Sequence, residues 1–149
     1  RMIDTNIKGL LYVTRAVAPG MVARRAGHIV NLGSIAGREV YPGGAVYCAT
    51  KHAVRALSQG MRQDLLPYGI RVSLICPGAV ETEFSIVRFK GNNQRAASVY
   101  DGYTPLSADD IARTIRFALT APAHVDLQDI LVMPTAQADA RTIHRTPKG

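Results

Sequence analysis

The chain has 149 residues, a length that suits one domain, and 47% of them are hydrophobic and 19% charged. A chain of this composition can bury a core, which excludes a disordered tail. The net charge is +7, but the arginines are dispersed and only Arg24 and Arg25 lie side by side. Dispersed cations are typical of solvated surfaces, so the charge favours an anionic small molecule as partner and argues against nucleic acid.

Cysteine usage and hydropathy limit the cofactors and the cellular setting. The two cysteines, Cys48 and Cys76, form no CxxC or Cys/His cluster, so we expect neither a metal site nor a disulfide framework. This cysteine usage fits a reduced cytoplasmic setting. Because no run of about 18 apolar residues occurs, we expect no membrane partner. The chain opens on Arg1 as if already inside an element, which predicts that its natural start lies upstream.

The first part of the chain predicts a helix, a strand and a loop. Apolar side chains recur at helical spacing from residue 3 to residue 25. Pro19 is expected to kink or divide this helix, and Gly27 to cap its end. A β-branched run over residues 28–32 predicts a buried strand, and the glycine-rich residues 33–44 predict a loop.

The middle of the chain repeats this alternation. Helical periodicity returns at residue 45 and runs to about residue 66, where Pro67 and Gly69 end it. Residues 70–76 predict a second buried strand. Residues 79–104 have weak periodicity and many polar groups, which is typical of a lid or a binding loop.

A last helix and strand follow. Ser107 is expected to begin the helix, with acidic side chains in its first turn. Its inner face is expected to carry Ile111, Ile115 and Leu119, and residues 130–133 predict the strand.

The alternation of helices and short apolar strands predicts an α/β protein with a parallel sheet covered on both faces. Such doubly wound sheets bind ligands beyond the carboxyl ends of their strands. Gly33 and Ser34 directly follow one predicted strand, and Pro77 and Gly78 follow the next. We therefore expect both segments at the ligand-binding edge of the sheet.

Three side chains, one of them in the Gly33-Ser34 segment, form a candidate catalytic set. Tyr47 and Lys51 are four residues apart on a predicted helix, so they share a face. A cation beside a tyrosine oxygen favours the phenolate and lowers the pKa of the phenol, which prepares it to exchange protons with an alcohol or carbonyl. Ser34 could reach the same substrate oxygen. The Tyr-x-x-x-Lys spacing by itself more often belongs to a surface tyrosine beside a solvated lysine.

Several motifs in the same order resemble those of the short-chain dehydrogenase/reductase family. They lie at residues 6–9, 28–34, 47–51 and 77–82, and the resemblance extends over about residues 1–145. It implies that the chain is the C-terminal part of a doubly wound, Rossmann-like domain. It also implies reversible hydride transfer between a nicotinamide cofactor and a secondary alcohol or carbonyl.

The resemblance implies roles for four catalytic residues. Tyr47 would exchange the proton, and Lys51 would lower the pKa of that tyrosine and hold the nicotinamide ribose. Ser34 would orient the substrate oxygen. Asn6 would keep a helix bend and a proton-relay water in place.

The resemblance also implies a cofactor site. Besides Tyr47 and Lys51 it would consist of the loop on the nicotinamide, which contains Pro77, Gly78, Ala79, Val80, Glu81 and Thr82. The expected cofactor is NADP, with NAD as an alternative.

One departure from the family is large. The glycine-rich phosphate loop, which the family places after its first strand, has no counterpart in this sequence. We therefore expect residues 1–149 to form a single partial dinucleotide-binding and catalytic domain. In isolation this fragment is expected to bind the cofactor poorly and to be inactive.

Residues 81–91 and the tail are similar to those of the NADP-dependent 3-hydroxy acid dehydrogenases. This branch implies serine, allo-threonine and the 3-hydroxypropionate/malonic semialdehyde pair as the class of small-molecule substrates. Because an arginine binds a carboxylate through two parallel hydrogen bonds, Arg88 is the candidate substrate clamp. A solvent-facing Arg88 is the competing interpretation.

Two other functions stay open. One is reduction of another ketone or of a 3-oxoacyl thioester, and the other is a non-catalytic module that joins full-length subunits.

The family also implies a homo-oligomer, a tetramer or dimer, in which the first helix and the Tyr47 helix pack across an interface.

Overall fold

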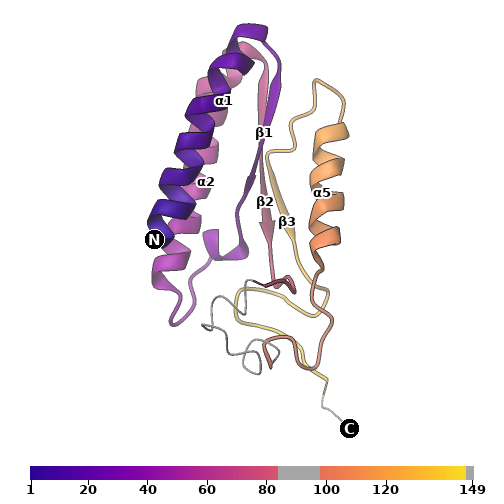
Figure 1. Cartoon of the computed structure of the whole chain (residues 1–149). Coiled ribbons are helices and arrows are strands. Elements are labelled where there is room, and N and C mark those ends of the chain that lie inside the picture. Colours follow the sequence, from indigo (N-terminus) through magenta and orange to yellow (C-terminus); the bar gives the residue numbers. More distant parts are fainter. Residues whose placement is uncertain (84–97, 147–149) are drawn as a thin grey trace.

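A computed structural model describes residues 1–83 and 98–146 of the chain (Figure 1). The elements alternate along the chain as the sequence predicts. In order they are the π-helix η1 (Asp4–Gly9), α1 (Leu10–Arg24), β1 (Gly27–Leu32), the 3₁₀-helix η2 (Ile35–Gly37), α2 (Ala45–Leu65), the 3₁₀-helix η3 (Leu66–Tyr68), β2 (Ile70–Pro77), α5 (Ala108–Thr120) and β3 (Asp129–Val132).

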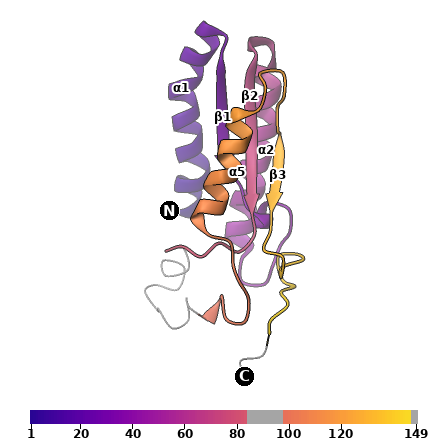
Figure 2. The same ribbon diagram turned by 90° about the vertical axis from the view of Figure 1, so that its right-hand side faces the viewer.

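The three strands form one parallel sheet in the order β1-β2-β3. Gly27 pairs with Ile70 at the start of the first ladder, and Leu74 pairs with Asp129 at the start of the second. Helices α1 and α2 lie on one face of the sheet and α5 lies on the other (Figures 1 and 2). The expected doubly wound α/β architecture is confirmed.

The core lies between the sheet and the helices α1 and α2. β2 is its centre, because almost every β2 side chain is buried, as a central parallel strand requires. One polar contact is built into this core: Asn31 Nδ2 donates to Ser58 Oγ at 2.9 Å, and that hydroxyl donates to the Val54 carbonyl. The larger core cluster consists of Ile29, Met61, Leu65, Ile70 and Val72.

Helix α1 differs from the sequence-based expectation at Pro19 and at Gly27. It is continuous through Pro19, so the expected division of the helix is wrong. A proline removes one backbone donor, and here the packing of Ala18, Met21 and Val22 on the core keeps the helix together. The helix is capped by Arg25 in the left-handed conformation (φ 50°), and not by Gly27, which is the first residue of β1.

The other boundaries follow the sequence closely. Helix α5 begins at a capping box, in which the Ser107 side chain and Asp110 bond each other's backbone N–H groups. Its inner face carries Ile111 and Ala118, whereas Leu119 is 46% exposed, so Leu119 was assigned to the wrong face. The reason is geometric: at 3.6 residues per turn, position 118 lies about 20° around the helix from Ile111, whereas position 119 lies about 80° away, at the edge of the apolar face.

All strands run in one direction, so their carboxyl ends meet at one edge of the sheet. The irregular segments that follow β1, β2 and β3 gather at this edge (Figure 1). This is where a parallel α/β sheet places its ligands.

Candidate active site

Ser34 is held just beyond the carboxyl end of β1. It is buried and forms the N-cap of η2, and its Oγ accepts a hydrogen bond from the Ala36 N–H at 3.1 Å. Gly37 ends η2 against α2 so closely that an added Cβ would lie 2.7 Å from the Lys51 carbonyl oxygen. Only a glycine permits this approach of the two backbones. The serine is thereby fixed beside the helix that carries Tyr47 and Lys51.

Tyr47 and Lys51 lie one turn apart near the start of α2. Lys51 Nζ is 5.8 Å from the centroid of the Tyr47 ring and donates a hydrogen bond to the Leu32 carbonyl at 2.9 Å. That carbonyl belongs to the last residue of β1. Burial lowers the pKa of the Lys51 ammonium, because the charged form loses solvation. The strand end therefore holds a partly desolvated cation beside the tyrosine.

Asn6 is connected to the tyrosine through one further side chain. It lies in the π-helix η1, the kind of local widening that occurs often at functional sites. Asn6 Nδ2 donates to Thr50 Oγ1 at 3.1 Å, and the Thr50 hydroxyl donates to the Tyr47 carbonyl at 2.8 Å. Asn6 therefore lies in an irregular turn of helix and is joined through Thr50 to the backbone of the Tyr47 turn.

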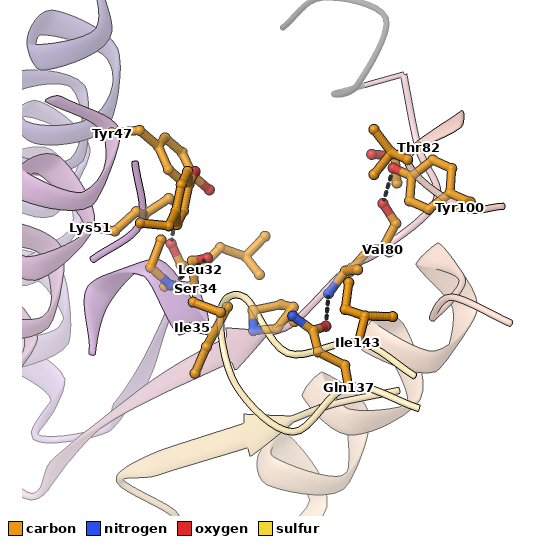
Figure 3. Close-up of a pocket in the computed structure, with 18 of the residues that line it drawn as sticks. Leu32, Ser34, Ile35, Tyr47, Lys51, Val80, Thr82, Tyr100, Gln137 and Ile143 are labelled. Atoms are coloured by element: carbon orange, nitrogen blue, oxygen red, sulfur yellow. Dashed lines mark hydrogen bonds between the residues drawn. The ribbon is translucent and has the colours of Figure 1, made fainter. Parts of the chain in front are cut away.

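A cavity of about 430 Å³ lies between α2 and the segment after β2. Ser34, Tyr47 and Lys51 line one side of it, and Val80, Thr82 and Tyr100 lie on the other (Figure 3). Its volume falls within the range typical of small-molecule sites. Of the loop predicted to contact the cofactor, the cavity is lined by Pro77, Gly78, Ala79, Val80 and Thr82.

Backbone hydrogen bonds fix this loop from both sides. The Gly78 N–H donates to the Val132 carbonyl at 2.8 Å, which continues the β2–β3 ladder by one residue. The Glu81 N–H donates to the Leu106 carbonyl at 2.8 Å, next to an isolated bridge between Val80 and Leu106. Glu81 itself is exposed and does not line the cavity.

The structure adds cavity residues that the sequence analysis did not identify. They come from the loop between η2 and α2, from the segment before α5 and from the C-terminal tail. In the tail, only the run of small and polar residues after β3 could have suggested an irregular segment. These residues include Tyr41, Val99, Tyr100, Tyr103, Gln137, Ala140 and Ile143. The cavity is therefore more aromatic than the sequence motifs alone indicate.

The predicted substrate clamp, Arg88, lies outside the described residues. Within residues 1–83 and 98–146, no group of three His, Cys, Asp or Glu side chains could hold a metal ion. No helix in this described part is long and apolar enough to cross a membrane.

Comparison with known proteins places the chain in a family. A model of the family described as short chain dehydrogenase matches residues 1–93. The NADP-dependent 3-hydroxy acid dehydrogenase of Salmonella typhi is 49% identical over 147 residues, which cover 97% of this chain and 59% of that protein. The enzyme of the same name from Schizosaccharomyces pombe is 46% identical over 144 residues, covering 97% and 56%.

Solved structures give the same result. A closed form of serine dehydrogenase complexed with NADP+ superposes with a TM-score of 0.91 at 47% identity, covering 97% of this chain and 59% of that one. A 3-oxoacyl-[acyl-carrier protein] reductase from Brucella melitensis with bound NAD has a TM-score of 0.69 at 30% identity, covering 88% and 48%.

The chain spans a little more than half the length of the curated relatives that it matches. Within that span its fold superposes on that of the serine dehydrogenase. In this chain Ser34, Tyr47 and Lys51 line one cavity. The chain belongs to the short-chain dehydrogenase family.

Proposed function

We propose that this chain carries the catalytic residues of an NADP-dependent dehydrogenase that acts on 3-hydroxy acids. One observation carries the proposal: Ser34, Tyr47 and Lys51 line a single cavity whose opposite wall is the loop of residues 77–82. The names of the relatives at 46–49% identity support the choice of cofactor and substrate class.

In this proposal each side chain handles the substrate oxygen or its proton. The Tyr47 hydroxyl gives a proton to, or takes one from, the oxygen of the substrate. The Lys51 ammonium favours the anionic form of the phenol, and the Leu32 carbonyl holds the ammonium in place. Ser34 donates a hydrogen bond to the same substrate oxygen. Asn6 supports the backbone of this turn through Thr50.

The residues present fit the nicotinamide end of the cofactor. The loop of residues 77–82 forms one wall of the cavity, and Gly78 allows this loop to pack directly against the segment after β3. Lys51 supplies a donor for ribose hydroxyls. When bound, the nicotinamide accepts or delivers the hydride. The glycine-rich cradle for the pyrophosphate has no counterpart among residues 1–83 and 98–146, so we propose only the nicotinamide half of the site here.

The test uses the product of the complete reading frame that contains these residues. We expect Tyr47→Phe to lower kcat for serine oxidation by about 10²- to 10⁴-fold, the usual contribution of a positioned acid or base. The dissociation constant for NADPH, measured by fluorescence titration, should change far less. A Tyr47→Phe variant that keeps more than a tenth of wild-type turnover would contradict the proposed proton transfer.

The substrate class is tested with a panel. Serine, allo-threonine and 3-hydroxypropionate are compared with a neutral secondary alcohol and with a 3-oxoacyl thioester. We propose that Arg88 binds the substrate carboxylate, so Arg88→Ala should raise KM for the acids much more than KM for the neutral alcohol. Equal increases would exclude the clamp. A preference for the thioester would favour the activity named for the Brucella melitensis reductase.

We also propose that the protein is a homo-oligomer that uses α1 and α2. Tyr12, Val13 and Val17 of α1 and Val46 of α2 are large apolar side chains with 42–69% exposure, and an exposed apolar group of this size is typical of an interface. Light scattering after size-exclusion chromatography measures the state directly. Tyr12→Lys should shift it towards the monomer, and an unchanged mass would contradict the use of α1.

A further inference from the structure

The tail after β3 forms part of the cavity. We call residues 133–146 the C-terminal strap. It runs beside the loop that follows β2 (Figure 1), and its residues Gln137 and Ile143 lie at the cavity (Figure 3). Three of its residues, Gln137, Ala140 and Ile143, line the cavity. A segment without a motif of its own therefore contacts the segment proposed to hold the cofactor.

Gln137 makes the central contact. Its side chain is buried, with 7% exposure, although glutamine is usually a surface residue. Oε1 accepts a hydrogen bond from the Ala79 N–H at 2.8 Å, and Nε2 donates to the Asp139 carbonyl at 3.0 Å. Both ends of the amide are used, so the orientation of the side chain is fixed. The strap is thereby joined to the middle of the 77–82 loop.

The contact at Gly78 is equally close. An added Cβ at this glycine would lie 2.6 Å from Gln137 Oε1, 2.8 Å from Met133 Sδ and 3.1 Å from Pro134 Cδ. The loop therefore rests directly on the strap, with no space for a side chain between them. A displacement of Gln137 would free the loop to move towards the strap.

The strap is itself tied to the other parts of the cavity. The Ala140 N–H donates to Glu39 Oε2 at 2.9 Å, on the segment that follows Ser34. The Thr146 N–H donates to the Gly102 carbonyl at 2.8 Å, and the Arg145 guanidinium lies 5.1 Å from the centroid of the Tyr103 ring. Hydrogen bonds thus attach the strap to the Glu39 side and to the Gly102 side of the cavity, and Gln137 belongs to this attached segment.

We propose that Gln137 is a positioning residue that sets where the 77–82 loop stands across the cavity from Tyr47. The inference rests on the proposed function, because it gives that loop a cofactor to hold. Gln137 acts through the Ala79 N–H and needs no contact with the cofactor itself. Its loss should weaken cofactor binding more than it slows turnover at saturating cofactor.

Two substitutions separate the two hydrogen bonds. Gln137→Met keeps the length of the side chain and removes both bonds. Gln137→Glu keeps an oxygen that accepts from the Ala79 N–H and loses the donor to Asp139. Thr142→Val is the matched control, because it removes a strap hydrogen bond to Asp139 that does not involve the loop.

The measurements are NADPH titration, steady-state kinetics and amide hydrogen exchange of the peptide that covers residues 77–83. We expect Gln137→Met to raise the NADPH dissociation constant about tenfold, the effect of one lost hydrogen bond that leaves a donor unpaired. The rise for Gln137→Glu should be about threefold or less, and Thr142→Val should match the wild type. Exchange in residues 77–83 should be faster only in Gln137→Met.

The outcomes distinguish this inference from the proposed function. A Gln137→Met protein with wild-type exchange in residues 77–83 would overturn the inference, as would an equal loss of affinity in Thr142→Val. All variants are made in the product of the complete reading frame, and if the wild type of that protein does not bind NADPH, the proposed function fails. The exchange of the cofactor-free protein still decides whether Gln137 positions the loop.

Discussion

The two walls of the cavity are built in different ways. The wall that carries Ser34, Tyr47 and Lys51 rests on β1, η2 and α2, and α2 is anchored in the core by buried Thr50 and Val54. We call it the helix wall. The opposite wall, here the loop wall, consists of irregular backbone in residues 77–82, residues 99–103 and the strap.

The two walls differ in how far apart in the sequence their contacting residues lie. On the helix wall, Ser34 and Lys51 are 17 positions apart in the sequence, and Tyr47 and Lys51 lie on the same helix, α2. On the loop wall, the decisive bonds join residues that are 58 apart (Ala79 and Gln137) and 101 apart (Glu39 and Ala140). Such contacts form only when the whole chain has folded, because closing long loops costs entropy. We therefore expect chemistry to depend on the helix wall and cofactor placement on the loop wall.

The largest loss of activity that tests this difference between the walls is expected for a substitution of Lys51. Lys51→Met removes the cation beside Tyr47 and leaves the Leu32 carbonyl without its donor. We expect kcat to fall about 100-fold or more, because the phenol loses the charge that favours proton transfer. Steady-state kinetics with serine would measure the loss. A change confined to KM would contradict the assignment of chemistry to the helix wall.

Gly37→Ala should disturb the helix wall through its backbone. The added Cβ would lie 2.7 Å from the Lys51 carbonyl oxygen, so η2 and α2 must separate. We expect a loss of about 1–3 kcal/mol in the free energy of unfolding, the typical cost of overpacking, together with lower turnover. Gly60→Ala is the matched control, because Gly60 lies within α2 with nothing inside 4 Å of its added Cβ. Denaturant unfolding that gives equal values for both variants would exclude the close approach at Gly37.

A smaller effect is expected at Glu39, which accepts a hydrogen bond from the strap of the loop wall. Glu39→Ala removes the acceptor of the Ala140 N–H and should loosen the strap, at a cost of about 1 kcal/mol in unfolding free energy. KM for the cofactor should rise while kcat stays close to the wild-type value. Glu39→Gln, which keeps an amide oxygen as acceptor, should restore most of the affinity. A fall in kcat without a change in KM would contradict the assignment of cofactor placement to the loop wall.

The smallest effect concerns pH. Burial lowers the pKa of Lys51 from its ordinary value of 10.5, so the unfolded chain binds more protons than the folded one between the lowered value and 10.5. Stability linked to this residue therefore rises with pH in that interval. We expect wild-type protein to gain unfolding free energy relative to Lys51→Met as pH increases towards 10.5. Parallel curves for the two proteins in urea unfolding would contradict the burial of the cation.

The extent of sequence-based prediction differs between the two walls. Strand runs such as 70–76, the cap at Ser107 and the Tyr-x-x-x-Lys spacing are local patterns, and the structure has them where the sequence places them. The division of the helix at Pro19 and the inward position of Leu119 were predicted wrongly. Core packing overrides a local helix breaker, and a step of eight residues moves a side chain towards the edge of the helix face. The place of Gln137 could not be predicted, since its partner is remote in the sequence.

The sequence by itself determined the α/β alternation, the parallel sheet and the set of Ser34, Tyr47 and Lys51, because periodicity and short spacing are properties of neighbouring residues. The tertiary structure alone decided that the Leu32 carbonyl holds the Lys51 ammonium, that the strap lines the cavity and that Gln137 joins it to Ala79. These contacts depend on where separate elements meet. That meeting is fixed by the packing of the whole core, which no single segment of the sequence encodes.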